Sequence, residues 1–164
     1  MGTIILFDSK YGTTADIASR LAENLGEDVH LVYLRDRGAL GASLEGIDLV
    51  VLGASVYAGS WSKRAVAFAR KRQAELAERK FAYFTVGLDL ESEGNRASAA
   101  LPPALVAGAV GAGKFGGAIL WSKMNAFERF IIKAMRKSEG DYSLVDLAAV
   151  DGFAKKLSQA MAGV

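Results

Sequence analysis

Hydroxyl side chains and a glycine cluster in one short segment near the amino terminus, where their chemistry suits an anion. The segment reads Asp8-Ser9-Lys10-Tyr11-Gly12-Thr13-Thr14 and follows an apolar run at residues 3–7. A helix that starts here offers free backbone N–H groups, and a glycine lets the backbone approach a ligand closely. Such a turn forms a nest for a phosphate dianion without any arginine. The sequence therefore predicts a phosphate-binding loop at Ser9, Lys10, Tyr11, Gly12, Thr13 and Thr14.

This loop differs from two common phosphate motifs. The dinucleotide fingerprint needs three glycines over six positions, and the triphosphate loop needs Gly-Lys followed by Ser or Thr. The segment has neither pattern. A simpler interpretation is that Ser9 and Thr13 only cap the next helix. The position of the loop directly after the first apolar run favours the phosphate site.

Two later segments are suited to a planar ring. Ser55-Val56-Tyr57-Ala58-Gly59-Ser60-Trp61 follows the apolar run 49–54, and Val86-Gly87-Leu88 closes the run that begins at residue 81. Glycine beside small residues lets a peptide lie flat against a ring, and Tyr57 or Trp61 could stack on it. Trp61 has an alternative role as a packing anchor at the start of the following helix.

The elements that would position these loops alternate along the chain. Short apolar runs at residues 3–7, 29–34, 49–54, 81–87 and 115–121 predict buried strands. Between and after them we expect helices at 14–25, ending at Gly26, at 62–79, capped by Ser62, at 102–110 and at 146–161. This order predicts a three-layer α/β/α fold with a doubly wound, five-stranded parallel sheet of order 2-1-3-4-5. The ligand site then lies at the carboxyl ends of strands one, three and four.

On these motifs the chain resembles the flavodoxin-like proteins, which bind flavin mononucleotide (FMN). The resemblance implies that residues 9–14 hold the FMN phosphate. It also implies that Ser55, Val56, Tyr57, Ala58, Gly59 and Trp61 address one side of the flavin and that Val86, Gly87 and Leu88 address the other. Tyr11 departs from the small hydroxyl residue usual in flavodoxins, and the tyrosine that often stacks on the outer ring face is missing after strand four.

The chain fits one domain over residues 1–164, with an extra helical insert at about 122–145. Within the insert, Phe127, Phe130, Ile131, Ala134 and Met135 fall on one helical stripe beside arginines and lysines. A basic helix with an aromatic stripe can lie on an anionic membrane surface. The alternative is a helix that packs on its own sheet.

The insert, the loop at 9–14 and the stretch 53–57 resemble the menaquinone-dependent protoporphyrinogen IX dehydrogenase family. This resemblance implies dehydrogenation of protoporphyrinogen IX, or of another small reduced organic substrate, through FMN to a quinone. It further implies peripheral membrane contact through the segment from Phe127 to Lys137. The alanine-rich segment 88–113, which contains Glu91 and Glu93, departs from the family pattern.

The composition of the chain limits which metal sites and nucleophiles its side chains can form. The chain has no cysteine and a single histidine, so no cysteine-ligated zinc, iron–sulfur cluster or thiolate nucleophile is expected, and no metal site is predicted. Redox chemistry would reside in flavin N5, and no side chain is nominated as catalytic. A basic stripe for nucleic acid is missing.

Flavodoxin-type carriers are generally strongly acidic and use this charge to dock on redox partners, whereas this chain has a net charge of +2. It therefore favours an FMN-dependent oxidoreductase over a flavodoxin-type electron-transfer protein. A flavin-binding regulatory protein is a third reading. Neither a signal peptide nor an apolar run of about 18 residues is present. The expected location is therefore the cytoplasm, with peripheral contact at the inner face of the cell membrane.

Overall fold

The computed structural model describes residues 2–57, 59–88, 90–136 and 140–163, with side chains for all of these except 90–94, 135 and 136. The strands are β1 (Gly2–Asp8), β2 (Val29–Tyr33), β3 (Ile47–Tyr57), β4 (Ser60–Trp61), β5 (Lys80–Val86), β6 (Gly111–Lys114), β7 (Ala118–Ile119) and β8 (Tyr142–Ser143). The α-helices are α1 (Thr13–Leu25), α2 (Lys63–Lys71), α3 (Gln73–Ala77), α4 (Leu90–Ala100), α5 (Pro103–Ala107), α6 (Ala126–Arg136) and α7 (Leu147–Met161). Two short 3-10 helices, η1 (Ala39–Gly41) and η2 (Trp121–Lys123), complete the elements.

The main sheet has the predicted parallel topology. Its order is β2-β1-β3-β5-β6, which corresponds to 2-1-3-4-5 for the five parallel strands, and β4 pairs with the end of β3 in an antiparallel hairpin. Central strands β1, β3 and β5 are rich in buried Ile, Leu, Val and Phe because helices cover both of their faces. The predicted flavodoxin-like arrangement is confirmed.

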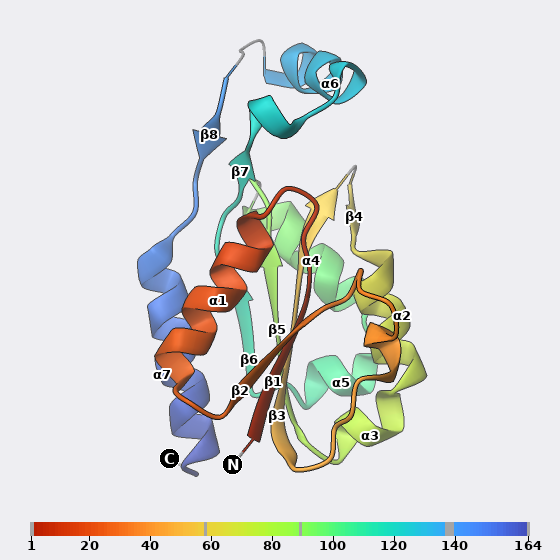
Figure 1. Cartoon of the computed structure of the whole chain (residues 1–164), viewed down its shortest axis with the longest axis vertical. Coiled ribbons are helices and arrows are strands. Elements are labelled where there is room, and N and C mark those ends of the chain that lie inside the picture. The colour runs from red at the N-terminus through yellow and green to blue at the C-terminus, as the bar shows by residue number, and fades with distance from the viewer. Residues whose placement is uncertain (1, 58, 89, 137–139, 164) are drawn as a thin grey trace.

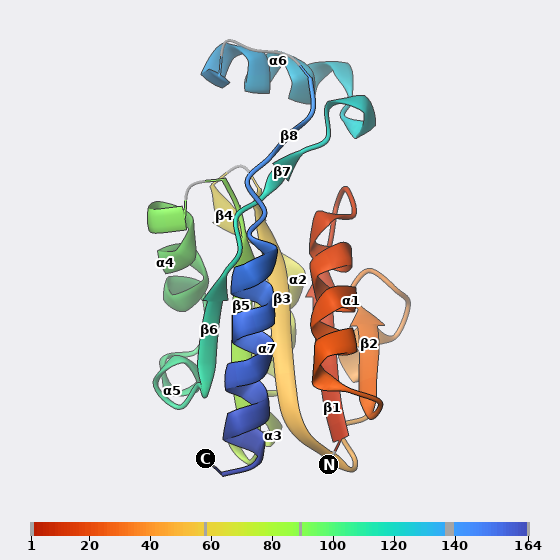
Figure 2. The ribbon, with the colours of Figure 1, turned by 90° about the vertical axis from the view of Figure 1, so that its left-hand side faces the viewer.

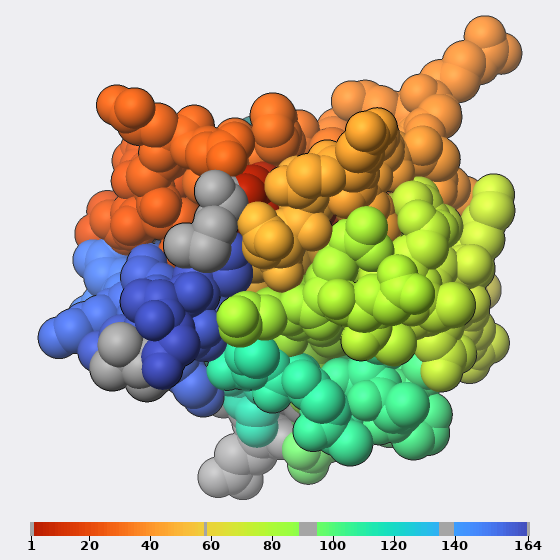
Figure 3. All heavy atoms as spheres, turned by 90° about the horizontal axis from the view of Figure 1, so that it is seen from below, coloured from red at the N-terminus to blue at the C-terminus, as the bar shows by residue number. Residues whose placement is uncertain are grey.

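The two faces of the sheet have separate cores. On one face, α1 and α7 pack against residues such as Ile5, Val51 and Phe84. On the other face, α2, α3, α4 and α5 cover Leu6, Val50 and Tyr83. Figure 2 shows α1 and α7 side by side in front of the sheet, and Figure 3 looks at the end where α3, α5 and the carboxyl end of α7 lie.

The fifth strand does not lie where the sequence pattern placed it. We predicted residues 115–121, but the strand is β6, whose sequence is Gly-Ala-Gly-Lys. Neighbouring aromatic rings take the place of its missing side chains, since a Cβ on Gly111 would lie 2.9 Å from the Phe153 ring and one on Gly113 would lie 2.4 Å from the Phe115 ring. A strand built from glycines has no hydrophobic periodicity, and the apolar pattern of its neighbours therefore misled the prediction.

The predicted helices at 14–25 and 146–161 correspond to α1 and α7, and Asp146 caps α7 by accepting from the Ala149 amide. The helix expected at 62–79 is broken at Arg72 into α2 and α3, with Ser62 as the predicted cap of α2. The helix expected at 102–110 is shorter and ends at Gly108, and α4 was not predicted. Within the described residues, no helix is both long and apolar enough to cross a membrane.

The chain between β6 and α7 forms an extension beyond the carboxyl ends of the strands. It consists of the antiparallel β7–β8 pair, η2 and α6, and Figures 1 and 2 show α6 standing clear of the sheet faces. The alternative in which this helix packs on its own sheet is therefore wrong.

Candidate functional site

A cavity of about 500 Å³ opens between the carboxyl ends of the central strands and α6. Its volume lies within the range of ordinary cofactor and substrate pockets. Three loops after β1, β3 and β5 form one side, and the extension forms the other. The lining residues are Ser9, Lys10, Tyr11, Thr13, Thr14, Ser55, Val56, Tyr57, Gly59, Val86, Gly87, Leu88, Gly117, Ala118, Ile119, Met124, Glu128, Ile131, Ile132 and Tyr142.

The loop after β1 is shaped to receive an anion. Gly12 occupies the residue before α1 with a φ of 103°, a left-handed conformation that glycine adopts without strain. Its N–H donates to Ser9 Oγ at 3.0 Å, and no side chain caps α1. The alternative in which Ser9 and Thr13 serve only as helix caps is therefore not supported. The first turn of α1 keeps its positive end open beside the hydroxyls of Thr13 and Thr14.

Hydrogen bonds made by Arg35, Ser62 and Tyr33 hold this loop in place. The buried Asp8 carboxylate accepts from Arg35 Nε at 2.6 Å and from Ser62 Oγ at 2.6 Å, which ties the end of β1 to the start of α2. The Tyr33 hydroxyl donates to the Ser9 carbonyl at 2.5 Å. These charge-assisted and neutral bonds fix the loop before any ligand binds.

The other two loops present backbone to the cavity. The β3–β4 hairpin turns at Gly59, whose φ is 76°, and pairs Val56 with Trp61. The Gly87 N–H donates to the Gly116 carbonyl at 3.1 Å, and a Cβ on Gly117 would lie 3.0 Å from Gly87 Cα. This close approach explains why a glycine stands at position 117.

The extension closes the cavity through one polar cluster. Glu128 of α6 is 8% exposed, forms an ion pair with Lys10 and accepts from the Tyr57 hydroxyl at 3.0 Å. The Lys10 ammonium lies 3.8 Å from the centre of the Tyr57 ring, a cation–π distance. Lys123 adds a second contact by donating to the Tyr11 carbonyl at 3.0 Å. The phosphate loop, the β3–β4 hairpin and α6 therefore meet at Glu128.

A capping box holds Glu128 in position. The Asn125 side chain accepts from the Glu128 N–H at 2.8 Å, and the Glu128 carboxylate accepts from the Asn125 N–H at 3.2 Å. The same carboxylate thus caps the first turn of α6 and links this helix to the loop after β1 through Lys10.

Electrostatics favour the charged forms of this pair. Burial alone would raise the pKa of Glu128, but its bonds with Lys10, Tyr57 and Asn125, together with the nearby Tyr11 hydroxyl, lower that pKa to about 2. Burial would lower the pKa of Lys10, yet Glu128 and the adjoining tyrosines raise it above the usual value. Burial, together with the nearby Glu128 carboxylate, raises the pKa of Tyr11 to about 12. At neutral pH the cluster holds one cation, one anion and neutral Tyr11.

The structure brings most of the predicted site residues together. Of those that the structure describes, all line the cavity except Gly12 and Trp61. Gly12 shapes the turn, and Ala58 lies outside the described residues. The prediction that Trp61 contacts the ring is corrected, because Trp61 is 3% exposed in the core and its indole N–H donates to the Ala54 carbonyl at 3.2 Å. This is the packing role left open as the alternative.

Sequence reasoning missed the residues that the extension supplies. They are Gly117, Ala118, Ile119, Met124, Glu128, Ile131, Ile132 and Tyr142. The Gly116-Gly117 pair and the Asn125-x-x-Glu128 capping pattern were visible signals, but neither indicates a contact more than 100 residues away. Among the described residues no group of three His, Asp or Glu side chains is placed to hold a metal ion.

The residues present fit FMN. Hydroxyls and an uncapped helix start suit its phosphate, and a slot of backbone and apolar side chains suits its ring. In addition, the Tyr11 hydroxyl is buried without a hydrogen-bond partner in the described structure, which leaves one polar group available to a bound molecule.

Comparisons with known proteins agree with this site. Solved structures with the same fold include a flavodoxin from Streptococcus pneumoniae TIGR4, with a TM-score of 0.60, 19% identity and 100% of both chains covered. An NADH:FMN oxidoreductase in its apo form has a TM-score of 0.60 and 15% identity over 98% of this chain and 90% of that one. The rubredoxin oxygen:oxidoreductase of Desulfovibrio gigas has a TM-score of 0.64 and 10% identity over 99% of this chain, which spans only 36% of that protein.

At these identities the structures show the fold alone, and a search of curated proteins finds no significant match. The model of one protein family, described as flavodoxin domain, matches residues 4–146 and thus includes all three loops of the cavity. The chain therefore belongs to the flavodoxin domain family, and this membership implies FMN binding for electron transfer or flavin-dependent oxidoreduction.

Proposed function

We propose that this protein is an FMN-dependent oxidoreductase that dehydrogenates a reduced organic substrate, protoporphyrinogen IX or a close relative, and passes the electrons to a quinone. The observation that supports this proposal most is the apolar wall that the extension adds to the flavin cavity. Met124, Ile131 and Ile132 line that wall, with Tyr142 beside them. An apolar wall opposite a flavin site suits a second planar molecule better than it suits water.

The residues of the chain would hold and shield the cofactor. The loop at 9–14 would bind the phosphate, while the backbone at 55–57 and 86–88 would border the ring. When bound, FMN supplies the redox chemistry by accepting hydride at N5. Glu128 is held as a carboxylate by Lys10 and Tyr57, so we assign it the role of fastening α6 rather than of moving protons.

The FMN-saturated protein tests this proposal under anaerobic conditions. Adding protoporphyrinogen IX should bleach the visible flavin bands, and adding menadione should then restore them faster than it reoxidises free reduced FMN. Bands that persist with the substrate, in a protein whose dithionite-reduced flavin still reacts rapidly with menadione, would move the proposal to another substrate. No reaction with either compound would contradict the oxidoreductase and favour the electron-transfer alternative.

We also propose that α6 lies on an anionic membrane surface, where a lipid-soluble quinone is found. Phe127 and Phe130 are each 70% exposed on α6, which is unusual for large aromatic side chains. Residues 121–136 contain Lys123, Arg129, Lys133 and Arg136 against a single acid, Glu128, which is already paired with Lys10. Exposed aromatic rings among cations are typical of interfacial helices.

A further inference from the structure

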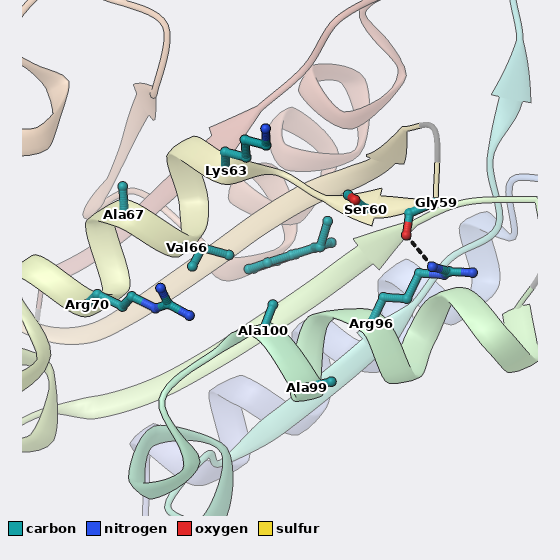
Figure 4. A pocket seen from close by; sticks show the side chains of 10 residues that line it. Gly59, Ser60, Lys63, Val66, Ala67, Arg70, Arg96, Ala99 and Ala100 are labelled. Carbon is teal, nitrogen blue, oxygen red and sulfur yellow. Dashed lines mark hydrogen bonds between the residues drawn. The ribbon is translucent and has the colours of Figure 1, made fainter.

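A second cavity, of about 630 Å³, adjoins the flavin cavity. It lies between α2, α4 and β4, and the two cavities share Gly59 (Figure 4). Its apolar lining comes from Trp61 and Val66 and from three alanines, Ala67, Ala99 and Ala100. Trp61 is fixed here, because its indole N–H is bonded to the Ala54 carbonyl.

Every charged side chain that lines this second cavity is a cation. Lys63 and Arg70 come from α2, and Arg96 comes from α4. Figure 4 shows Arg70 reaching from one wall toward Ala100 and Arg96 reaching from the opposite helix toward the turn at Gly59. No acidic side chain lines the cavity in the part of the chain whose side chains the structure describes.

None of these three cations forms an ion pair with a described residue. Arg96 donates to the Gly59 carbonyl, a neutral acceptor that orients the guanidinium toward the turn. Lys63 and Arg70 form no hydrogen bond or ion pair with any described residue. Other arginines nearby are satisfied, since Arg72 pairs with Glu75 and Arg64 lies 4.0 Å from the Asp8 carboxylate.

An apolar surface edged by three cations suits one chemical class of ligand. A small inorganic anion would leave the apolar lining uncovered, whereas a neutral aromatic molecule would leave the cations unused. We propose that this cavity is a binding groove for a planar aromatic molecule that bears two or more carboxylates. Its rings would cover Val66, Ala99 and Ala100, and its carboxylates would contact Arg70, Arg96 and Lys63. Binding in this groove does not depend on the proposed redox function.

Isothermal titration calorimetry of the FMN-saturated protein tests this groove, because bound FMN blocks the other cavity. The probe is naphthalene-2,6-dicarboxylate, and its neutral counterpart is 2,6-naphthalenedimethanol. We expect saturable binding of the dicarboxylate only, weakening as salt is raised. In the Lys63→Ala/Arg70→Ala double variant the Kd should rise by about tenfold or more.

Lys71→Ala is the matched control, because Lys71 is an exposed cation on the same helix that does not line the groove. Its Kd should stay within about twofold of the unaltered protein. A second variant, Ala99→Trp, tests where the probe binds. The indole should fill the groove and abolish binding of the dicarboxylate, while FMN is retained. Equal binding of the neutral probe, absence of binding at millimolar concentration, or equal loss in Lys71→Ala would each overturn the proposal. Failure of the flavin-bleaching experiment would leave these results unchanged.

Discussion

At the residue scale, Glu128 fixes the position of α6 against the cavity. It is nearly buried, and its carboxylate is shared by an ammonium, a phenol and a backbone amide. A buried carboxylate without these partners would be costly, whereas with them it is held in its charged form. One side chain thereby links the phosphate loop, the β3–β4 hairpin and α6.

Substituting this carboxylate should change how stability depends on pH. The pKa of Glu128 is lowered to about 2 in the folded protein, so its contribution is present above about pH 4.5 and is lost as the pH falls toward 2. In urea unfolding without added flavin, the free energy of unfolding of the unaltered protein should fall by about 1–3 kcal/mol more than that of Glu128→Gln between pH 6 and pH 2. Glu45→Gln, an exposed acid, is the control. Parallel curves for all three proteins would show that Glu128 titrates alike in the folded and unfolded states.

At the element scale, β6 forms the edge of the sheet although three of its four residues are glycine or alanine. Gly111 and Gly113 leave room that the rings of Phe153 and Phe115 occupy, and those two rings contact each other edge to face with centroids 5.3 Å apart. The rings thus supply the apolar surface that β6 itself lacks.

Two glycine-to-alanine changes should therefore have opposite effects. Gly113→Ala should lower the free energy of unfolding by about 2 kcal/mol, because the new methyl group would overlap the buried Phe115 ring. Gly152→Ala should raise it by about 0.5–1 kcal/mol, because Gly152 lies within α7 and a Cβ there has nothing within 4 Å. Urea denaturation measures both. A neutral Gly113→Ala would mean that the Phe115 ring can move aside at little cost.

At the scale of the whole molecule, the extension stands beyond one end of the main sheet (Figure 1), and its residues form one side of the first cavity. One side of α6 lines the cavity through Glu128, Ile131 and Ile132, while Phe127 and Phe130 are exposed. A membrane bound by those two aromatic side chains would therefore lie close to the helix that lines the cavity, which suits an acceptor that arrives through the lipid.

Vesicle flotation tests this contact. The protein should float with phosphatidylglycerol vesicles and much less with phosphatidylcholine vesicles, and Phe127→Asp together with Phe130→Asp should abolish flotation. Neither side chain lines the cavity, so FMN should be retained. Leu31→Asp, at an exposed apolar position on β2, should float normally. Flotation of the double variant at the normal level would contradict the membrane proposal.

The sequence by itself determined the α/β fold, the strand order and the three loops of the cavity. Hydrophobic periodicity shows which faces are buried, and right-handed crossover connections then leave few arrangements of the strands. Ser9, Thr13 and Thr14 could be assigned to one site because each belongs to a single local turn at a helix start.

Only the tertiary structure decided which distant groups meet. The Lys10–Glu128 pair joins residues 118 positions apart, and its partners carry no local sign of each other. The same holds for Trp61, whose type suits both a ring contact and a core position until the packing around Ala54 settles it. The strand β6 also became visible only through its pairing with β5, because two of its four residues are glycines and the strand has no hydrophobic pattern of its own.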